Sequence, residues 1–329
     1  MFLDITEIVL NLANRGVDVL RLDAVAFMWK RLGTRCQSKP EVQMLLQALR
    51  ACCRIACPAV LHREQAIVAP AEMLRYLGRG KHDWREGNLA YHNSLMVQFW
   101  GALATCDARI TRHVLATHFP YFLTNATFAT YIRRHDAIGW AVTDEDARAM
   151  NLSGHAHRAL LSNFYEGTFP GTFARGVLFQ GNKATGNKRI SGGIASLTGL
   201  EKAQTEGDFG EAELAVQRIL LGHALIDGLG AIPLIYMGVE LAMLNDHSYL
   251  GVPELAHDSR WIQRPMMDWQ AAKFHHSDEG AAEQVFRGVK DILHRRKLTP
   301  ALHAAHPVRI VDCGPTALFA FVRARPTGA

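Results

Sequence analysis

The sequence predicts an α/β fold built on a parallel sheet or barrel. Short apolar runs rich in Val, Leu and Ile alternate along the chain with segments whose apolar residues recur at helical spacing. In three of the apolar runs, polar residues gather at the carboxyl-terminal end. Parallel barrels build their functional sites from this end of the strands. The two observations together indicate that strands alternate with helices and carry functional residues where they end.

The expected elements follow one another along the whole chain. Helices are predicted where apolar residues recur every three or four positions, and strands where short apolar runs are continuous. The predicted helices cover residues 5–13, 38–55, 94–105, 215–229 and 285–293. The predicted strands cover residues 17–27, 58–68, 88–93, 128–136 and 231–240, and a hairpin with a Gly-Pro turn is expected over 308–324.

Two further features concern helix starts and loops. The segment SKPE matches a capping box, with Ser38 as the N-cap and Glu41 three residues later. Residues 141–215 and 241–280 lack the alternation, and we expect them to form two long irregular loops that contribute to a site.

Composition and charge narrow the functional classes. The 329 residues are 49% hydrophobic, which is enough apolar material for a large core. The net charge is +5, but Lys and Arg are scattered and form no basic run with interleaved aromatic residues, so nucleic-acid binding is disfavoured. The six cysteines lack zinc-ribbon spacing and are expected to be reduced thiols. With no signal peptide and no apolar run of membrane-spanning length, we expect a cytoplasmic protein.

The polar residues at the strand ends indicate carboxylate chemistry. Arg21 and Asp23 are two residues apart, so on a strand their side chains share one face. The guanidinium keeps the aspartate ionised, which suits a nucleophile. Two carboxyl groups about 5–5.5 Å apart are the arrangement of a retaining glycosidase. The three polar clusters are Arg21 with Asp23, Glu64 with Gln65, and His135 with Asp136.

Seven segments in order resemble a known family. The sequence is similar to amylosucrase, in the sucrose-using branch of the α-amylase superfamily (glycoside hydrolase family 13), from about residue 5 to the last strands. The segments that carry the resemblance are GVDVLRLDAVAFMWKRLGT, PAV with QAIVAP, YIRRHDAIGW, FARGVLFQGN, KRISGGIASLTGL, IPLIYMGVE and DSRWIQRP.

The resemblance implies retaining glucosyl transfer from sucrose to an α-glucan, with release of fructose and without a metal or organic cofactor. Asp23 matches the nucleophile, and Asp136 matches the carboxylate that stabilises the transition state. The matching sugar-binding residues are Arg21, His135, Arg189 and Arg260. The expected partners are therefore sucrose and α-glucan acceptors, and neither nucleic acid nor a membrane.

One position departs from the family at its acid/base glutamate. Gln65 stands there, and Glu64 precedes it. An amide supplies no proton, and loss of acid/base help typically costs about 10²–10⁴-fold in rate. Because neighbouring strand residues face opposite sides, Glu64 should face outward if Gln65 faces the site. The alternative is a bulge that turns Glu64 inward.

The resemblance also covers only part of the family's architecture. We expect an incomplete (β/α)₈ barrel of TIM type, with about five of its eight strands, over residues 1–305, and the truncated start of a C-terminal β-domain over 306–329. The chain is then a C-terminal fragment or a degenerate paralogue with impaired activity. Two alternatives are a non-catalytic sucrose- or glucan-binding protein and another family-13 α-glucosidase or sucrose hydrolase. Trp140 is a candidate for stacking on a sugar ring.

Overall fold

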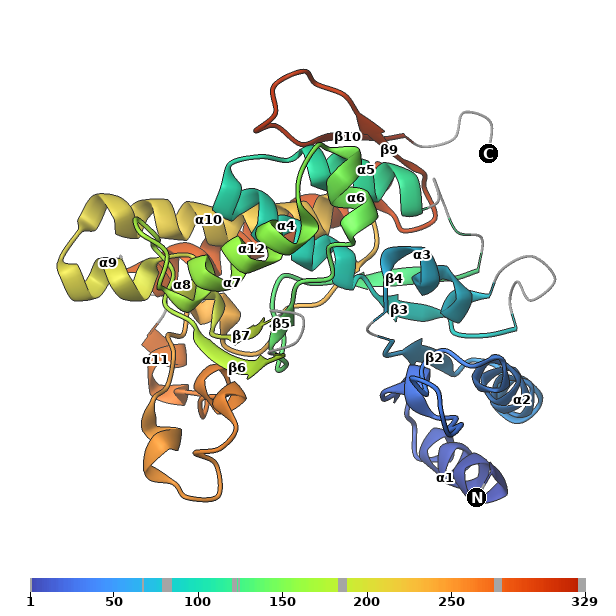
Figure 1. Ribbon diagram of the computed structural model, residues 1–329. Coiled ribbons are helices and arrows are strands. Elements are labelled where there is room, and N and C mark those ends of the chain that lie inside the picture. Colours follow the sequence, from blue (N-terminus) through green and yellow to red (C-terminus); the bar gives the residue numbers. More distant parts are fainter. Residues whose placement is uncertain are drawn as a thin grey trace. The chain divides into compact units, whose positions relative to one another are not determined.

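A computed structural model describes residues 2–66, 68–78, 85–119, 123, 125–182, 188–274 and 280–324. The chain divides into two compact units (Figure 1). Unit 1 consists of Met1–Asn93 and Thr117–Ala129, and unit 2 of Ser94–Ala116 and Thr130–Ala329.

Unit 1 is built on a parallel sheet with the strand order β1-β2-β3-β4. The register aligns Leu22 with Glu64 at the ends of β1 and β2, and Leu89 with Thr127 in β3 and β4. The elements are α1 (Phe2–Asn14), β1 (Val19–Leu22), η1 (Val25–Phe27), α2 (Pro40–Ala56), β2 (Leu61–Glu64), α3 (Pro70–Met73), η2 (Leu74–Leu77), β3 (Leu89–Tyr91) and β4 (Thr127–Thr130). The predicted α/β fold with a parallel sheet of barrel type is confirmed.

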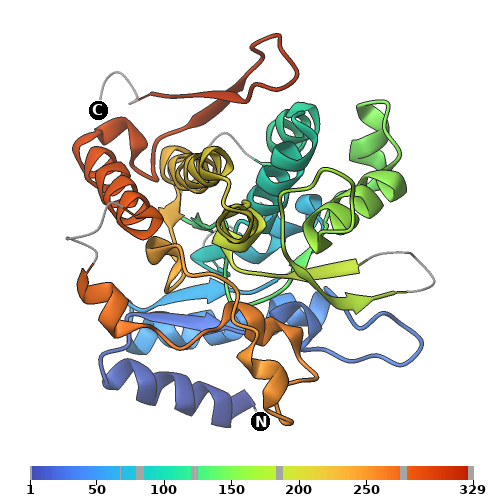
Figure 2. The same cartoon turned by 90° about the vertical axis from the view of Figure 1, so that its left-hand side faces the viewer.

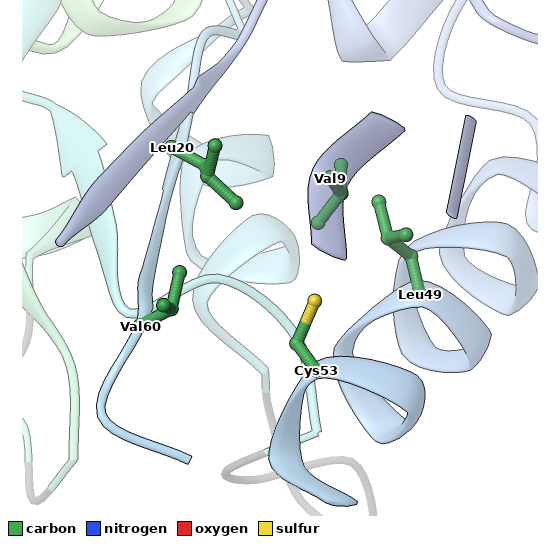
Figure 3. Close-up of a cluster of buried hydrophobic side chains, with 5 residues drawn as sticks. All are labelled: Val9, Leu20, Leu49, Cys53 and Val60. Atoms are coloured by element: carbon green, nitrogen blue, oxygen red, sulfur yellow. The ribbon is translucent and has the colours of Figure 1, made fainter. Parts of the chain in front are cut away.

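A small apolar core joins the first two helices of unit 1 to its sheet. Val9 from α1, Leu20 from β1, and Leu49 and Cys53 from α2 are buried together with Val60, and their side chains converge in Figure 3. The helical spacing of apolar residues in α1 and α2 directs one side of each helix toward this cluster. Burial of these side chains stabilises the unit by removing apolar surface from water.

Unit 2 is mainly helical and also contains antiparallel strands. Helices α10 and α12 pack side by side (Figure 2). Strands β5, β7 and β6 form an antiparallel sheet, and β9 pairs with β10 in a hairpin, as predicted. The remaining elements of the chain are α4 (Asn93–Thr105), α5 (Arg109–His118), β5 (Ile138–Gly139), α6 (Asp144–Ala149), α7 (Gly154–Glu166), β6 (Val177–Gly181), β7 (Lys188–Ser191), α8 (Ile194–Leu197), α9 (Leu200–Glu206), α10 (Phe209–Gly228), β8 (Ile232–Pro233), η4 (Val239–Leu241), η5 (Ser248–Gly251), η6 (Ser259–Gln263), α11 (Trp269–Phe274), α12 (Ala281–Leu298), η7 (Pro300–Leu302), β9 (Val308–Val311) and β10 (Ala320–Arg323).

The predicted irregular loop over 141–215 is wrong. This stretch contains helices α6 to α9 and strands β6 and β7, and α10 begins within it. The side chains of Thr143 and Ser153 accept hydrogen bonds from the backbone at the start of α6 and α7. Helices α6, α8 and α9 have only four to seven residues, too few for apolar periodicity to show, whereas α7 has 13 residues and is marked by its Ser153 cap. Residues 241–280 do consist largely of turns and short helices in their described part.

The predicted capping box at Ser38 is also wrong. Lys39 is the N-cap residue of α2, and no side chain caps this end. Ser38 has a positive φ of 50° and its hydroxyl hydrogen-bonds the Tyr76 hydroxyl at 2.8 Å. Pro40 at the first helical position starts α2 without a cap, because its fixed φ suits a helix and it has no N–H to satisfy.

All five predicted strands are shorter than their apolar runs. Each run continues past the sheet into a turn or loop, so apolar composition overestimates strand length. Within the described residues, the observed strands are Val19–Leu22, Leu61–Glu64, Leu89–Tyr91, Thr127–Thr130 and Ile232–Pro233. All six cysteines are free thiols. No helix among the described residues is long and apolar enough to cross a bilayer.

Candidate active site

In unit 1, three of the predicted site residues lie together where β1 and β2 end. The Arg21 guanidinium donates one hydrogen bond to Asp23 at 3.2 Å and another to the side-chain oxygen of Gln65. The Gln65 N–H bonds the Leu22 carbonyl at 3.0 Å, which fixes its backbone to the end of β1. The Asp23 side chain is 64% exposed, whereas Gln65 is buried. Arg21 thus links an accessible carboxylate to a buried amide.

The chain turns sharply directly after Asp23. Ala24 adopts a left-handed conformation with φ of 48°, which ends the strand and starts η1. Non-glycine residues rarely adopt this conformation, and such positions cluster at functional sites. The turn leaves the Asp23 carboxylate at the rim of unit 1.

Glu64 faces away from this cluster. It is 1% exposed and packs so closely against Gly87 that a β-carbon there would lie 2.3 Å from Glu64 Cγ. Strands β1 and β2 pair in unbroken register up to Glu64, so no bulge turns this side chain toward Arg21. Burial, and then the nearby charge of Glu86, raise the pKa of Glu64 to about 8.

In unit 2, the predicted residue Asp136 is surrounded by cationic groups. Its carboxylate lies 3.0 Å from Arg134 Nη1, 3.5 Å from His135 Nε2 and 3.4 Å from Arg260 Nη1. Burial by itself raises the pKa of this carboxyl, but Arg134, His135, Arg260 and Arg189 outweigh it and hold the pKa below its usual value. Asp136 is therefore ionised at neutral pH.

Arg189 and Arg260 share one aromatic ring. Their guanidinium carbons lie 5.3 Å and 4.6 Å from the centre of the Phe179 ring, a cation–π arrangement. Arg260 is paired with Asp258 at 2.7 Å, whereas Arg189 hydrogen-bonds the neutral amide of Gln180 at 3.2 Å. Within the described residues, no carboxylate lies within ion-pair distance of Arg189. Burial, opposed in part by Asp136, lowers the pKa of Arg189.

The predicted site residues therefore form two clusters, one in each unit. Sequence analysis missed Arg134, Phe179 and Asp258. The signal for Arg134 was its position beside His135, and the signal for Asp258 was its N-cap position before Arg260. Trp140 is buried and stacks on Tyr165 with ring centres 5.4 Å apart, so it is a core residue. No metal-binding group of three or more His, Cys, Asp or Glu side chains occurs in the described part of the chain.

The chain is similar in sequence and in structure to several known carbohydrate-active enzymes. No family profile matches the sequence. Glucosylglycerate phosphorylase of Spirochaeta thermophila is 24% identical over 99% of this chain and 51% of its own length. The enzyme of the same name from Allomeiothermus silvanus is 23% identical over 94% of this chain and 52% of its own. The solved structure of sucrose 6F-phosphate phosphorylase from Thermoanaerobacter thermosaccharolyticum aligns with a TM-score of 0.67 at 16% identity, over 98% of this chain and 56% of the other.

The chain is similar to these enzymes and shares the fold of the solved structures, which supports the predicted α-amylase superfamily. The amylosucrase branch remains a prediction. The chain spans about half the length of the curated relatives it matches. The chain also aligns with the solved structure of an α-amylase from H. orenii at a TM-score of 0.57, with 10% identity over 99% of this chain and 52% of the other.

Proposed function

We propose that this chain takes part in retaining transfer of a glucosyl group, with Asp23 as the nucleophile and Asp136 as the stabilising carboxylate. The observation that carries the proposal is the Arg21 guanidinium, which bonds Asp23 and Gln65 at the ends of neighbouring strands. The guanidinium contacts the exposed Asp23 carboxylate as an ion pair. In unit 2, the cations around Asp136 keep a second carboxylate ionised.

The first chemical step forms a bond between an Asp23 carboxylate oxygen and the anomeric carbon of glucose. The bond between that carbon and the leaving-group oxygen breaks, and the electron pair stays on the oxygen. Gln65 is an amide, so it cannot protonate this oxygen. Leaving groups that need a proton should therefore depart slowly, by about 10²–10⁴-fold. Leaving groups that are stable as anions need no such help.

A phosphorylase-type reaction fits this restriction. Phosphate attacks the glucosyl enzyme as an anion and, in the reverse direction, leaves glucose 1-phosphate as an anion, so this half of the reaction requires no proton from position 65. The other half, in which a glucoside releases an alcohol, still needs a proton and should be slow. Arg189, a cation without a carboxylate partner among the described residues, suits an anionic substrate group. Two relatives that align over nearly the whole chain are phosphorylases by name. We therefore favour phosphate as the acceptor.

A second candidate is the amylosucrase reaction, in which sucrose donates glucose to an α-glucan. It is favoured by the seven ordered sequence segments, including the one that contains Arg260. In this case Gln65 impairs the reaction, because fructose and the glucan hydroxyl both need proton transfer. Hydrolysis of sucrose or another α-glucoside, and binding of sucrose or glucan without turnover, are the remaining alternatives.

Trapping with α-glucosyl fluoride tests the proposal directly. Fluoride departs without a proton donor, so the unaltered chain should gain the mass of one glucosyl group on the peptide that contains Asp23. Asp23→Asn should abolish the labelling, whereas Asp18→Asn, at a nearby aspartate outside the cluster, should not. Labelling that persists in Asp23→Asn, or no labelling of the unaltered chain, would contradict the proposed nucleophile.

Two product measurements separate the candidates. Exchange of labelled phosphate into glucose 1-phosphate supports the phosphorylase-type reaction, and release of fructose from sucrose with growth of a glucan supports the amylosucrase reaction. A melting temperature raised by sucrose, without labelling or turnover, supports the binding protein.

A further inference from the structure

One buried glutamine of unit 2 uses its whole hydrogen-bonding capacity on the loop that carries Asp136. Gln263, the last residue of η6, is 3% exposed. Its oxygen accepts hydrogen bonds from the Gly192 N–H at 2.6 Å and from the Arg133 guanidinium. Its nitrogen donates to the carbonyls of Arg134 at 3.2 Å and Asp136 at 2.9 Å. An amide offers two donors and two acceptor sites, and all are occupied.

Arg133 completes this network from the loop side. It is buried, and its guanidinium donates to the Gly192 carbonyl and to the Asp136 carbonyl, both at 2.6 Å. Burial lowers its pKa to about 9, so it is still charged at neutral pH. A buried charge held by neutral acceptors is costly unless its geometry is well satisfied. The three segments that meet at Arg133 and Gln263 are therefore held in one arrangement.

The residue after Gln263 extends the same contact. Arg264 donates to the His135 carbonyl at 2.9 Å. The carbonyls of 134, 135 and 136 thus all accept hydrogen bonds from residues 263 and 264. Arg260, in the same short helix, lies against the Asp136 carboxylate. The segment 260–264 therefore contacts both the main chain beneath Asp136 and its side chain.

We infer that Gln263 is a positioning residue, which acts with Arg133 and Arg264 to hold the Asp136 carboxylate against Arg260. The inference rests on the proposed function for the role of Asp136, but the geometry it describes exists independently of any reaction. Loss of the Gln263 bonds frees the loop from η6 and increases the separation between Asp136 and Arg260. Burial, which raises the pKa of the Asp136 carboxyl, is then opposed less strongly by the charge of Arg260.

The pKa of the Asp136 carboxyl measures this positioning. The full chain is labelled with ¹³C at the aspartate carboxyl carbon, and the resonance is assigned by its loss in Asp136→Asn. In the unaltered protein the pKa of Asp136 should lie below its usual value. Gln263→Met should raise it, and Arg264→Met should raise it less. Gln217→Leu, at an exposed glutamine of α10, is the matched control and should leave it unchanged.

Each outcome decides the inference. A folded Gln263→Met protein in which Asp136 titrates as in the unaltered chain would overturn it. If Gln263→Met does not fold, Arg264→Met decides alone, because its side chain is partly exposed and its loss removes only one bond to the loop. The titration is independent of turnover, so failure of α-glucosyl fluoride labelling would refute the proposed function and leave this result standing.

Discussion

Glu64 and Gln65 are adjacent in the chain, yet their side chains point to opposite sides of the sheet in unit 1. Gln65 accepts a hydrogen bond from Arg21, and Glu64 is buried against Gly87. The alternation of side chains along an extended strand accounts for this difference. The Glu64 carboxyl group, next to position 65 in the chain, is therefore turned away from the cluster that contains Asp23.

Restoring a carboxyl group at position 65 should increase activity. In Gln65→Glu, the new side chain can protonate a leaving group, so release of fructose from sucrose, or of another alcohol from a glucoside, should rise by about 10²–10⁴-fold. Arg21 favours the ionised form of a neighbouring carboxyl, so the gain should be larger at lower pH, where more of the acid form is present. The measurement is initial product release over a pH series. Combining this change with Asp23→Asn should abolish the increase in rate. If the double variant still shows the increase, Asp23 is not the nucleophile of the reaction measured.

The buried carboxyl of Glu64 should make unit 1 less stable at alkaline pH. Its pKa in the folded chain is raised to about 8, above the usual value of about 4.3 in an unfolded chain. The folded state therefore binds the proton more tightly, and stability falls as the pH rises from about 4.3 to 8. Glu64→Gln should flatten this dependence and gain on the order of a few kcal/mol at pH 9 relative to pH 5. Urea unfolding at the two pH values measures it.

Glu86 shares this environment, since burial raises its pKa to about 7 despite a hydrogen bond from Gln47. Glu7→Gln, at an exposed position of α1, is the control and should leave the pH dependence unchanged. Equal slopes in the unaltered chain and in Glu64→Gln would show that Glu64 is not protonated in the folded state.

The close contact at Gly87 should not tolerate a methyl group. A β-carbon at this position would lie 2.3 Å from Glu64 Cγ and 2.8 Å from the Tyr76 carbonyl oxygen. Gly87→Ala should therefore destabilise unit 1 by about 1–3 kcal/mol, the usual cost of overpacking. Gly251→Ala is the control, because nothing lies within 4 Å of its β-carbon position. Chemical denaturation of both variants checks the difference, and a neutral Gly87→Ala would mean that β2 is more loosely packed.

The core of unit 1 should depend on Leu49. This side chain of α2 is buried in the cluster that contains Val9 and Leu20, and Leu49→Ala should cost about 2–5 kcal/mol in the free energy of unfolding. Leu3→Ala, at a side chain that is 78% exposed in α1, should change it by no more than about 0.5 kcal/mol. Fluorescence-monitored urea titration distinguishes the two. Similar effects for both variants would argue against the packing in Figure 3.

Local patterns predicted the long elements well and the short ones poorly. The apolar periodicity of α1, α2 and α10 gave their positions, because a helix that packs on a sheet must repeat its apolar residues. Within 141–215, helices α6, α8 and α9 are too short for that signal, and the 13-residue α7 is marked instead by its Ser153 cap. At Ser38 the capping pattern was present, but a hydrogen bond to Tyr76, distant in sequence, determined the conformation.

The sequence alone determined the alternation of strands and helices outside residues 141–215, the similarity to α-amylase-type enzymes, and the amide at position 65, since each is written in consecutive residues. Tertiary structure decided that Gln65 and not Glu64 contacts Arg21, and that Gln263 holds the loop of Asp136. The physical reason is that both contacts are long-range in sequence. Arg21 and Gln65 are 44 positions apart, and Asp136 and Gln263 are 127 positions apart. Such contacts depend on how the elements pack, and no periodicity within a single segment encodes them.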